Sequence, residues 1–212
     1  MTLKRSQVQV LIRPQRKFLF MTQVFGYLSG IFVLLGTFPY LRDIFRRTTK
    51  PQRSSWFIYS VLGGISFFSQ AAKGATFSLW LTGIDTLSVI LIFLLSLRFG
   101  VGGFSKKDYR TLLAAAAGLI AWYFTQEAAI ALYLVIGIDA LGTYLTVEKA
   151  YQDPGSETSS AWFLVAIGGI FGMLAVGKLD IILLSYPLYI FLANASVVVA
   201  IALGKRLQKI SQ

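Results

Sequence analysis

This chain of 212 residues contains no cysteine and no histidine. Their absence excludes disulfides, thiolate and imidazole metal ligands, and histidine proton relays. Acidic residues are few, with 9 Asp and Glu against 20 Lys and Arg, and the formal net charge is +11. The basic residues lie in the connectors between apolar runs, which is the pattern of membrane proteins. We therefore do not expect nucleic acid as a partner.

Motifs of catalytic chemistry are also missing. The sequence has no HExxH zinc motif, no nucleophile elbow, no phosphate-binding loop, and no lysine inside an apolar run that could hold retinal. We expect neither an enzyme nor a bound cofactor or metal.

Apolar residues make up 56% of the chain, and the mean hydropathy is +0.67. Apolar runs of this length, repeated along a chain, are typical of transmembrane helices, so the lipid bilayer is the expected surrounding. We predict an all-α membrane protein with seven transmembrane helices. Their expected ranges are 19–41, 56–72, 77–98, 111–125, 128–148, 160–176 and 181–203.

The sequence repeats itself weakly at an offset of 106 residues. This offset pairs Gly36-Thr37 with Gly142-Thr143, Ser54 with Ser160, Trp56-Phe57 with Trp162-Phe163, and Gly63 with Gly169. A duplication of this length is common in transporters. We predict a 3+1+3 arrangement, in which two parallel three-helix repeats are joined by a single linker helix that restores the orientation.

The domain boundaries follow from this arrangement. Residues 1–18 form a basic N-terminal tail, and Met21 is an alternative first residue. Repeat 1 covers residues 19–98, and the connector with the linker helix covers 99–127. Repeat 2 covers 128–203, and the C-terminal tail covers 204–212.

Basic residues also predict the topology. The connectors after the first, third and fifth expected helices and the C-terminal tail carry five, four, one and three Lys or Arg, when Arg98 at the end of the third helix is counted with its connector. The other three connectors carry one, none and one. By the positive-inside rule the C-terminus is cytoplasmic and, with seven spans, the N-terminus is outside. The basic tail conflicts with an outside N-terminus, and a start at Met21 would remove that conflict.

A resemblance rests on the connector after the first helix. Pro39-Tyr-Leu-Arg-Asp is followed by Thr49-Lys-Pro-Gln-Arg-Ser-Ser-Trp56, and Trp56 opens the second helix. With the 3+1+3 layout, this resembles the PQ-loop and SWEET superfamily of small-solute transporters, and more narrowly a group of small bacterial membrane proteins. The resemblance covers nearly the whole chain after residue 20. It implies a multi-pass protein of the bacterial inner membrane.

The chain departs from that superfamily at two points. The motif position holds Pro39-Tyr40 instead of proline-glutamine, and the aligned position in the second repeat is Leu145, which removes one hinge proline. SWEET-type transporters place an asparagine on the third and the seventh helix, where this chain has Asp85 and Asn194. The resemblance therefore implies a solute site at this depth but does not support sugar selectivity.

The expected function is transport of a small polar solute, such as a sugar, amino acid or vitamin, by alternating access between the repeats. The alternative is a seven-helix receptor or scaffold that transports nothing. The oligomeric state is not predicted.

Asp85 and Asp139 are the strongest candidates for a binding site. Each lies inside an apolar run, where an ionised carboxylate is expensive, so each either bonds a neighbouring helix or lines a polar cavity. Such a cavity would hold the substrate or a coupling proton or cation. Gln70 and Asn194 either bind a polar solute or bridge helices, and Trp80 either stacks on a ligand or anchors the chain at the interface.

An inner gate is expected near the end of the first helix, with Pro39 and Tyr40 at the hinge. Arg42 and Asp43 align with Glu148 and Lys149 in the second repeat. Opposite charges at equivalent positions predict ion pairs across the repeat axis, and the alternative is contact with anionic lipid.

Overall fold

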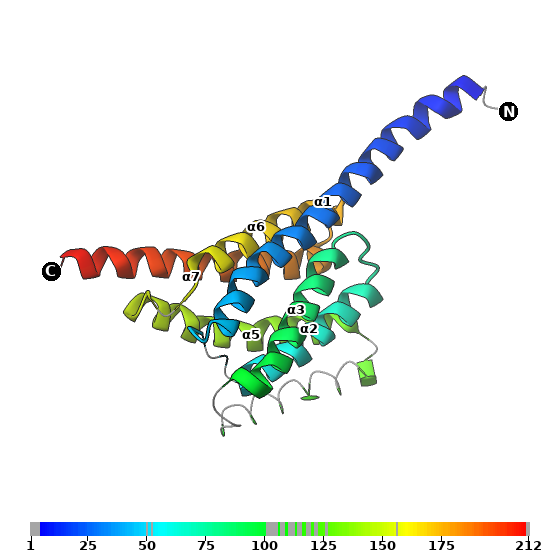
Figure 1. The fold of residues 1–212 in the computed structure, drawn as a ribbon. Coiled ribbons are helices and arrows are strands. Elements are labelled where there is room, and N and C mark those ends of the chain that lie inside the picture. Colours follow the sequence, from blue (N-terminus) through cyan, green and yellow to red (C-terminus); the bar gives the residue numbers. More distant parts are fainter. Residues whose placement is uncertain are drawn as a thin grey trace.

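The described part of the chain is helical. A computed structural model describes residues 5–49, 51, 53–100, 127–155 and 157–210, with scattered positions between 106 and 125 (Figure 1). The helices are α1 (Arg5–Phe45), α2 (Arg53–Ala72), α3 (Leu79–Phe99), α5 (Ala128–Gln152), α6 (Ser159–Val176) and α7 (Ile181–Ile210). The expected all-α class is confirmed within these residues. The expected linker helix at 111–125 and the tail residues 1–4 lie largely or wholly outside them.

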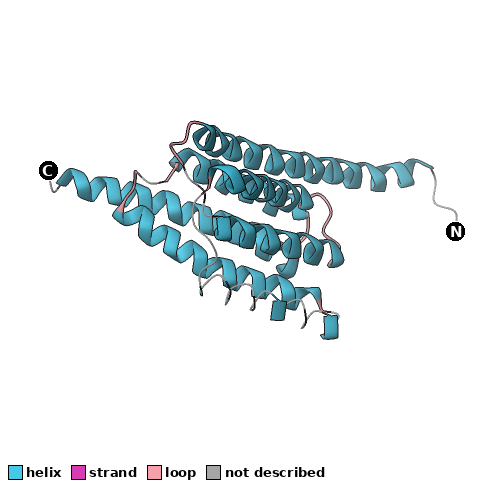
Figure 2. Cartoon of the chain, turned by 60° about the horizontal axis from the view of Figure 1, so that its bottom comes forward, coloured by secondary structure: helices cyan, strands magenta, loops and turns pink. Residues whose placement is uncertain are grey.

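The six helices form a closed ring in the order α1, α3, α2, α5, α7, α6, and then α1 again. Figure 2 shows them running side by side. The seam between α1 and α6 is packed far more extensively than the opposite seam between α2 and α5. The ring therefore consists of two halves, α1–α3 and α5–α7, which meet at one tight seam and one loose seam.

The two ends of the ring differ in the segments they carry. The turns 73–78 and 177–180 lie together with Phe18 and Thr22 of α1 at one end, which we call the turn end. The start of α5 lies there as well, because Lys73 Nζ is 2.6 Å from Glu127 Oε2. At the other end, the connector end, Asp43 of α1 contacts Thr158 before α6. Hence α1, α3, α5 and α7 run from the turn end to the connector end, and α2 and α6 run back.

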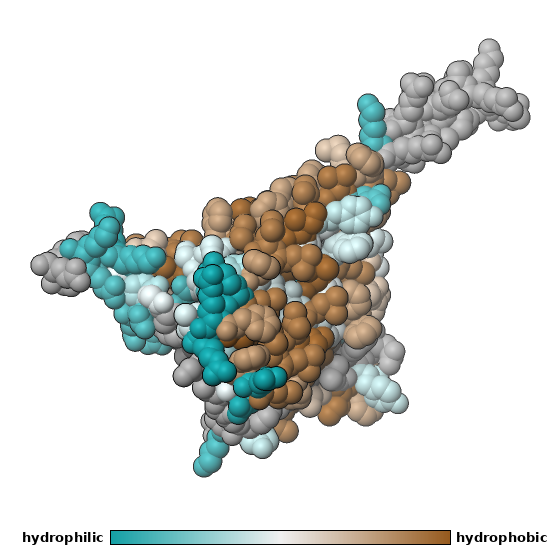
Figure 3. Space-filling model, viewed as in Figure 1, coloured by the Kyte–Doolittle hydropathy of each residue, from teal (hydrophilic) through white to brown (hydrophobic). Residues whose placement is uncertain are grey.

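Large apolar side chains are exposed on all six described helices. On the face seen in Figure 3 they spread across the middle, and hydrophilic residues gather towards the end of α7 and in a group between it and the apolar area. Four described helices are long and apolar enough to cross a membrane: Lys17–Phe45, Leu79–Phe99, Ser159–Val176 and Ile181–Lys209. Among the residues searched, α5 contributes a shorter apolar helical segment, Ala128–Ala140. These helices are consistent with a membrane protein, whereas seven separate spans are not established.

Several helices are longer than predicted. The first begins at Arg5 instead of about residue 19, so most of the expected tail is helical, and it continues through Pro39 to Phe45. The fifth reaches Gln152 and the last Ile210. The beginning of α1 and the end of α7 project beyond the ring (Figure 1). Polar residues limit how far a helix can lie in lipid, but they do not end it.

The helix ends have local causes. Arg47 adopts a left-handed conformation with φ 58°, its N–H bonds the carbonyl of Ile44, and the N–H of Thr48 bonds that of Asp43. This is the Schellman pattern, which usually has glycine at the left-handed position. Gly74 and Gly177, with φ of 81° and 68°, supply that conformation after α2 and α6.

The 106-residue offset corresponds to equivalent contacts. The second helix begins at Arg53 and the sixth at Ser159, which are 106 residues apart. Thr37 bonds Ser88 of α3 at 3.0 Å, and its counterpart Thr143 also bonds the third helix of its half, although at Tyr189 of α7 and not at Asn194, the counterpart of Ser88. The paired glycines at 63 and 169 also behave alike, because each lies against the following helix of its own half.

Candidate functional site

The two intramembrane aspartates lie near one another, on opposite halves of the ring. Asp85 lies about two turns into α3 and Asp139 near the middle of α5, and both side chains are partly accessible. They are close enough to interact electrostatically, and Tyr186 of α7 lies close to both. Three helices thus bring two carboxyl groups and one phenol together at the boundary between the halves.

Asp139 is held by a chain of hydroxyl groups. The Tyr189 hydroxyl donates a hydrogen bond to Asp139 Oδ2, and Thr143 Oγ1 lies 3.0 Å from the same hydroxyl. Because the phenol proton is directed to the carboxylate, the threonine hydroxyl is the donor to the tyrosine oxygen. Asp139 and Thr143 are four residues apart on α5 and therefore share one helix face. This chain fixes the carboxyl group of Asp139 against α7.

Apolar side chains close the space around Tyr186. Val33, Leu81, Leu132 and Ile190 form a buried cluster with it, contributed by four helices. This cluster, which we call the apolar plug, packs four helices together around Tyr186.

Gln70 is fully buried but does not join the aspartates. Its Nε2 donates to Thr82 Oγ1 at 2.8 Å and to the Ser66 carbonyl at 3.3 Å. These contacts lie inside the first half of the ring, between α2 and α3. They place Gln70 nearer the turn end than Asp85.

The remaining predicted binding residues lie elsewhere. Asn194 is buried, and its Nδ2 donates to the carbonyl of Ile190 on its own helix at 2.8 Å. Trp80 is 45% exposed on the first turn of α3 and lies edge-on to the ring of Tyr27. The structure thus brings Asp85 and Asp139 together, whereas the contacts of Gln70, Asn194 and Trp80 given above are with other groups.

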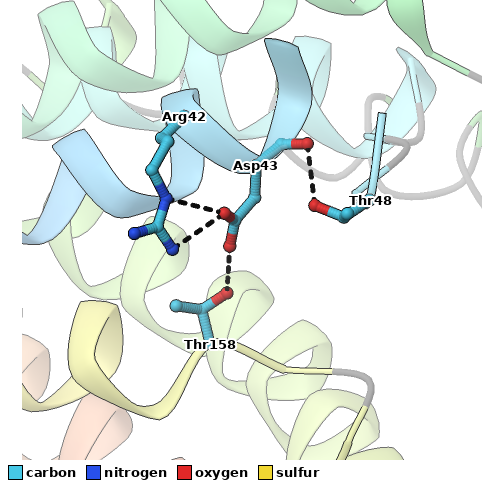
Figure 4. A network of polar contacts seen from close by, with 4 residues as sticks. All are labelled: Arg42, Asp43, Thr48 and Thr158. Atoms are coloured by element: carbon cyan, nitrogen blue, oxygen red, sulfur yellow. Dashed lines mark hydrogen bonds and ion pairs between the residues drawn. The ribbon is translucent and has the colours of Figure 1, made fainter. Parts of the chain in front are cut away.

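The predicted gate residues lie at the connector end. Arg42 Nη2 is 3.0 Å from Asp43 Oδ1, and Asp43 Oδ2 is 3.4 Å from Thr158 Oγ1 (Figure 4). Thr158 is the N-cap residue of α6, so the carboxylate of Asp43 lies where the helix dipole favours a negative charge. The contact across the tight seam is therefore between Asp43 and Thr158.

The other gate candidates make local contacts. Pro39 lies within α1, and the Tyr40 ring packs against Trp56 with centroids 5.1 Å apart. Glu148 bonds Gln152 on its own helix at 3.5 Å. The predicted pair between Arg42 and Glu148 is not formed among these described residues.

A cavity of about 240 Å³ opens at the turn end. It is lined by the beginning of α1 and by both turns, including Thr22, Gly74, Ser78, Gly177 and Lys178. Lys178 is paired with Asp180 at 3.1 Å. The cavity lies on the same side of the apolar plug as Gln70.

Sequence reasoning missed the tyrosines and hydroxyls of this site. Tyr186 and Tyr189 stand three residues apart around Pro187, so they share one helix face, a spacing that is visible in the sequence. The alignment of Thr143 with Thr37 was a second available signal.

Comparison with known proteins adds no relative to these observations: no family model, no curated protein and no solved structure matches this chain.

Proposed function

We propose that this protein is a membrane transporter for a small polar solute, which binds between the two halves of the ring. The observation that carries the proposal is the aspartate pair, with Asp85 from one half and Asp139 from the other. A solute held between them contacts both halves at once. Movement of one half against the other then changes the side from which the solute is reached.

The architecture we propose is 3+1+3, with α1–α3 and α5–α7 as parallel repeats and 111–125 as the linker. The ring order supports it, because α3 packs against both α1 and α2, as α7 packs against both α5 and α6. Thr37 and Thr143 each bond the third helix of their own half, which is a second point of agreement. On this basis we also propose membership of the PQ-loop and SWEET superfamily, a place in the bacterial inner membrane, and an outside N-terminus with a cytoplasmic C-terminus.

The chemistry of the pair favours a cationic solute or a coupling proton. Two carboxyl groups in a low-dielectric layer repel each other when both are ionised, and a cation or a proton between them relieves this repulsion. Tyr186 and Tyr189 add hydroxyl groups for hydrogen bonds to the solute. A neutral sugar would use the hydroxyls but leave the charges uncompensated.

At the connector end we propose that Asp43 and Thr158 form the inner gate, in place of the pair expected between Arg42 and Glu148. Their bond joins α1 to α6 where the connectors meet, and it breaks if the two halves separate there.

The test begins with a ligand screen. Purified protein is heated with sugars, amino acids, cationic amines and vitamins, and a ligand at one hundred times its Kd should stabilise the fold by about 2.7 kcal/mol. Uptake of each hit is then measured in protein-loaded vesicles. Binding without uptake would establish the receptor alternative and reject transport.

Asp85→Asn then tests the site itself. This variant keeps the shape and removes the titratable group, so uptake and its pH dependence should be lost while the protein still folds. Asp180→Asn is the matched control, since this carboxyl group lies outside the helices, before α7. Uptake unchanged in magnitude and in pH dependence in Asp85→Asn would reject the proposed site.

A further inference from the structure

Five buried side-chain oxygens have no hydrogen-bond partner in the described part of the chain. They belong to α2, to α3 and to the residue before α3: Ser66 Oγ, Ser69 Oγ, Gln70 Oε1, Ser78 Oγ and Thr86 Oγ1. Ser66 lies beside Tyr186, but no bond of ordinary geometry joins the two hydroxyls. Buried polar groups in native proteins are almost always satisfied, so this concentration on one helix pair requires a partner.

The fold itself does not require polar residues at these places. At the 106-residue offset, the positions in the second half are all apolar: Gly172, Ala175, Val176, Leu184 and Leu192. The two halves pack their helices in the same pattern, but these five positions carry hydroxyl or amide groups only in the first half. The polar groups are therefore a property of this half.

These groups form a line. Ser78, Thr82 and Thr86 are spaced by four residues on one face of α3, and they span about 12 Å along the helix. The facing helix contributes Gln70, which bonds Thr82, and Gly63, where an added Cβ would lie 3.0 Å from Thr86 Oγ1. The line follows the interface between the two helices.

One end of the line lies at the cavity, and the other lies one residue from the aspartate. Ser78 lines the cavity at the turn end, Thr86 follows Asp85 in the chain, and Ser66 of the facing helix lies beside Tyr186, which is close to Asp85. Asp85 is faced by Asp139 from α5 and by Tyr186 from α7. The line thus leads from the cavity, past the apolar plug, to the candidate site.

We propose that this line holds a file of water molecules that connects the turn-end cavity with Asp85. Each water accepts from or donates to two or more of the orphaned groups, which is the ordinary way in which buried polar atoms are satisfied. Protons can then reach Asp85 from the turn end by a route inside α2 and α3, separate from the space between the halves. The consequence for Asp85 rests on the proposed function, whereas the water file itself does not.

The absence of cysteine makes the test direct. Thr82→Cys places a thiol on the line, at a position with 0% exposure, and Leu188→Cys places one at the equivalent position of α7, which is 42% exposed on the outer surface of the ring. Each variant, in lipid nanodiscs, receives a pulse of Ag⁺ as its nitrate. The thiol that remains free is then labelled with maleimide in denaturant and counted by intact mass.

We expect Ag⁺ to block the thiol of Thr82→Cys at least tenfold faster than that of Leu188→Cys, because Ag⁺ travels in water and not in lipid. Blocking of Thr82→Cys that is no faster than that of Leu188→Cys indicates a dry core and overturns the proposal. Thr86→Cys and Leu192→Cys form a second matched pair, which decides the question if Thr82→Cys does not fold. Fast blocking by Ag⁺ in a protein that takes up no solute would reject the proposed function and leave the water file standing.

The route is tested by closing its entrance. Ser78→Leu introduces the residue found at the equivalent position, Leu184, and in the Thr86→Cys background it should slow blocking by at least tenfold. Blocking at an unchanged rate would show that Ag⁺ arrives from elsewhere and would overturn the proposed path.

Discussion

The tight seam between α1 and α6 depends on Gly36, and this dependence can be measured. A Cβ on Gly36 would lie 2.7 Å from Val165 Cγ2 and 2.9 Å from the Ala161 carbonyl oxygen. The valine methyl can rotate, but the carbonyl belongs to the backbone of α6, so the two helices must move apart. Overpacking of this kind costs roughly 1–3 kcal/mol.

Gly36→Ala also gains helix propensity, about 1 kcal/mol relative to glycine. Gly64→Ala in α2 gains the same term, and an added Cβ there meets nothing within 4 Å. The difference between the two variants therefore isolates the close approach of α1 and α6. We expect Gly64→Ala to be neutral or stabilising, and Gly36→Ala to be less stable than it by roughly 1–3 kcal/mol.

The assay is reversible unfolding in mixed micelles, followed by circular dichroism as the denaturing detergent increases. Both variants and the parent chain are compared at one lipid-to-detergent ratio, so that differences in the free energy of unfolding are meaningful. Equal free energies for Gly36→Ala and Gly64→Ala would show that the seam tolerates a methyl group and would refute the argument.

Three further predictions use the same unfolding assay. Arg47→Gly should raise the free energy of unfolding by about 1 kcal/mol, because glycine adopts the left-handed conformation at φ 58° without strain, and a lower value would contradict the assigned helix end. Tyr189→Phe should lower it by about 1–3 kcal/mol, since Asp139 loses its donor, and an unchanged value would mean that this bond is not formed. The Leu183 N–H holds the pKa of Asp180 below its usual 3.8, so the ionised carboxylate stabilises the fold above that pH. This contribution is lost as the pH falls through the lowered pKa. The free energy of unfolding of Asp180→Asn should therefore fall less steeply in acid than that of the parent chain, and parallel pH profiles would refute the cap.

The course of the helices was largely predictable, and the ends of three were not. Apolar runs indicate which residues can lie in lipid, and this gave the positions of all six described helices. They do not indicate where the backbone stops being helical, because Arg, Lys and Gln are good helix formers in water. The first helix therefore extends back to Arg5, and the last continues to Ile210.

The candidate site was predictable only in its charged members. Asp85 and Asp139 stand out because a carboxyl group is costly in an apolar run. Tyr186 and Tyr189 do not, since a phenol ring counts as apolar and its hydroxyl matters only when the helix direction is known. Asn194 shows the opposite error: its amide bonds its own helix, a choice of rotamer that the sequence does not reveal.

The expected pair between Arg42 and Glu148 followed from their equivalent positions in the two repeats. Equivalence fixes where a residue lies within its own half, but it does not bring the two residues into contact. Asp43 instead reaches Thr158, at the beginning of the helix that packs against its own.

The directions of the helices have an electrostatic consequence for the described bundle. At the turn end α3, α5 and α7 begin and α2 and α6 end, whereas α1 begins farther out, at Arg5, so the dipoles of these helices do not cancel there. The excess of one N-terminus leaves roughly half a positive elementary charge at the turn end, and the excess of one C-terminus leaves roughly half a negative charge at the connector end, where α1, α3 and α5 end and α2 and α6 begin.

Arginines gather at that negative end, and one of them caps a helix directly. Arg53 donates from Nε to the Ser96 carbonyl at 3.1 Å and from Nη2 to the Gly100 carbonyl at 3.0 Å, at the end of α3. Under the proposed topology, the arginines that would hold the connectors on the cytoplasmic side also neutralise the negative charge of the helix dipoles there. Replacing these arginines would therefore disturb both the orientation of the protein in the membrane and the stability of the helices.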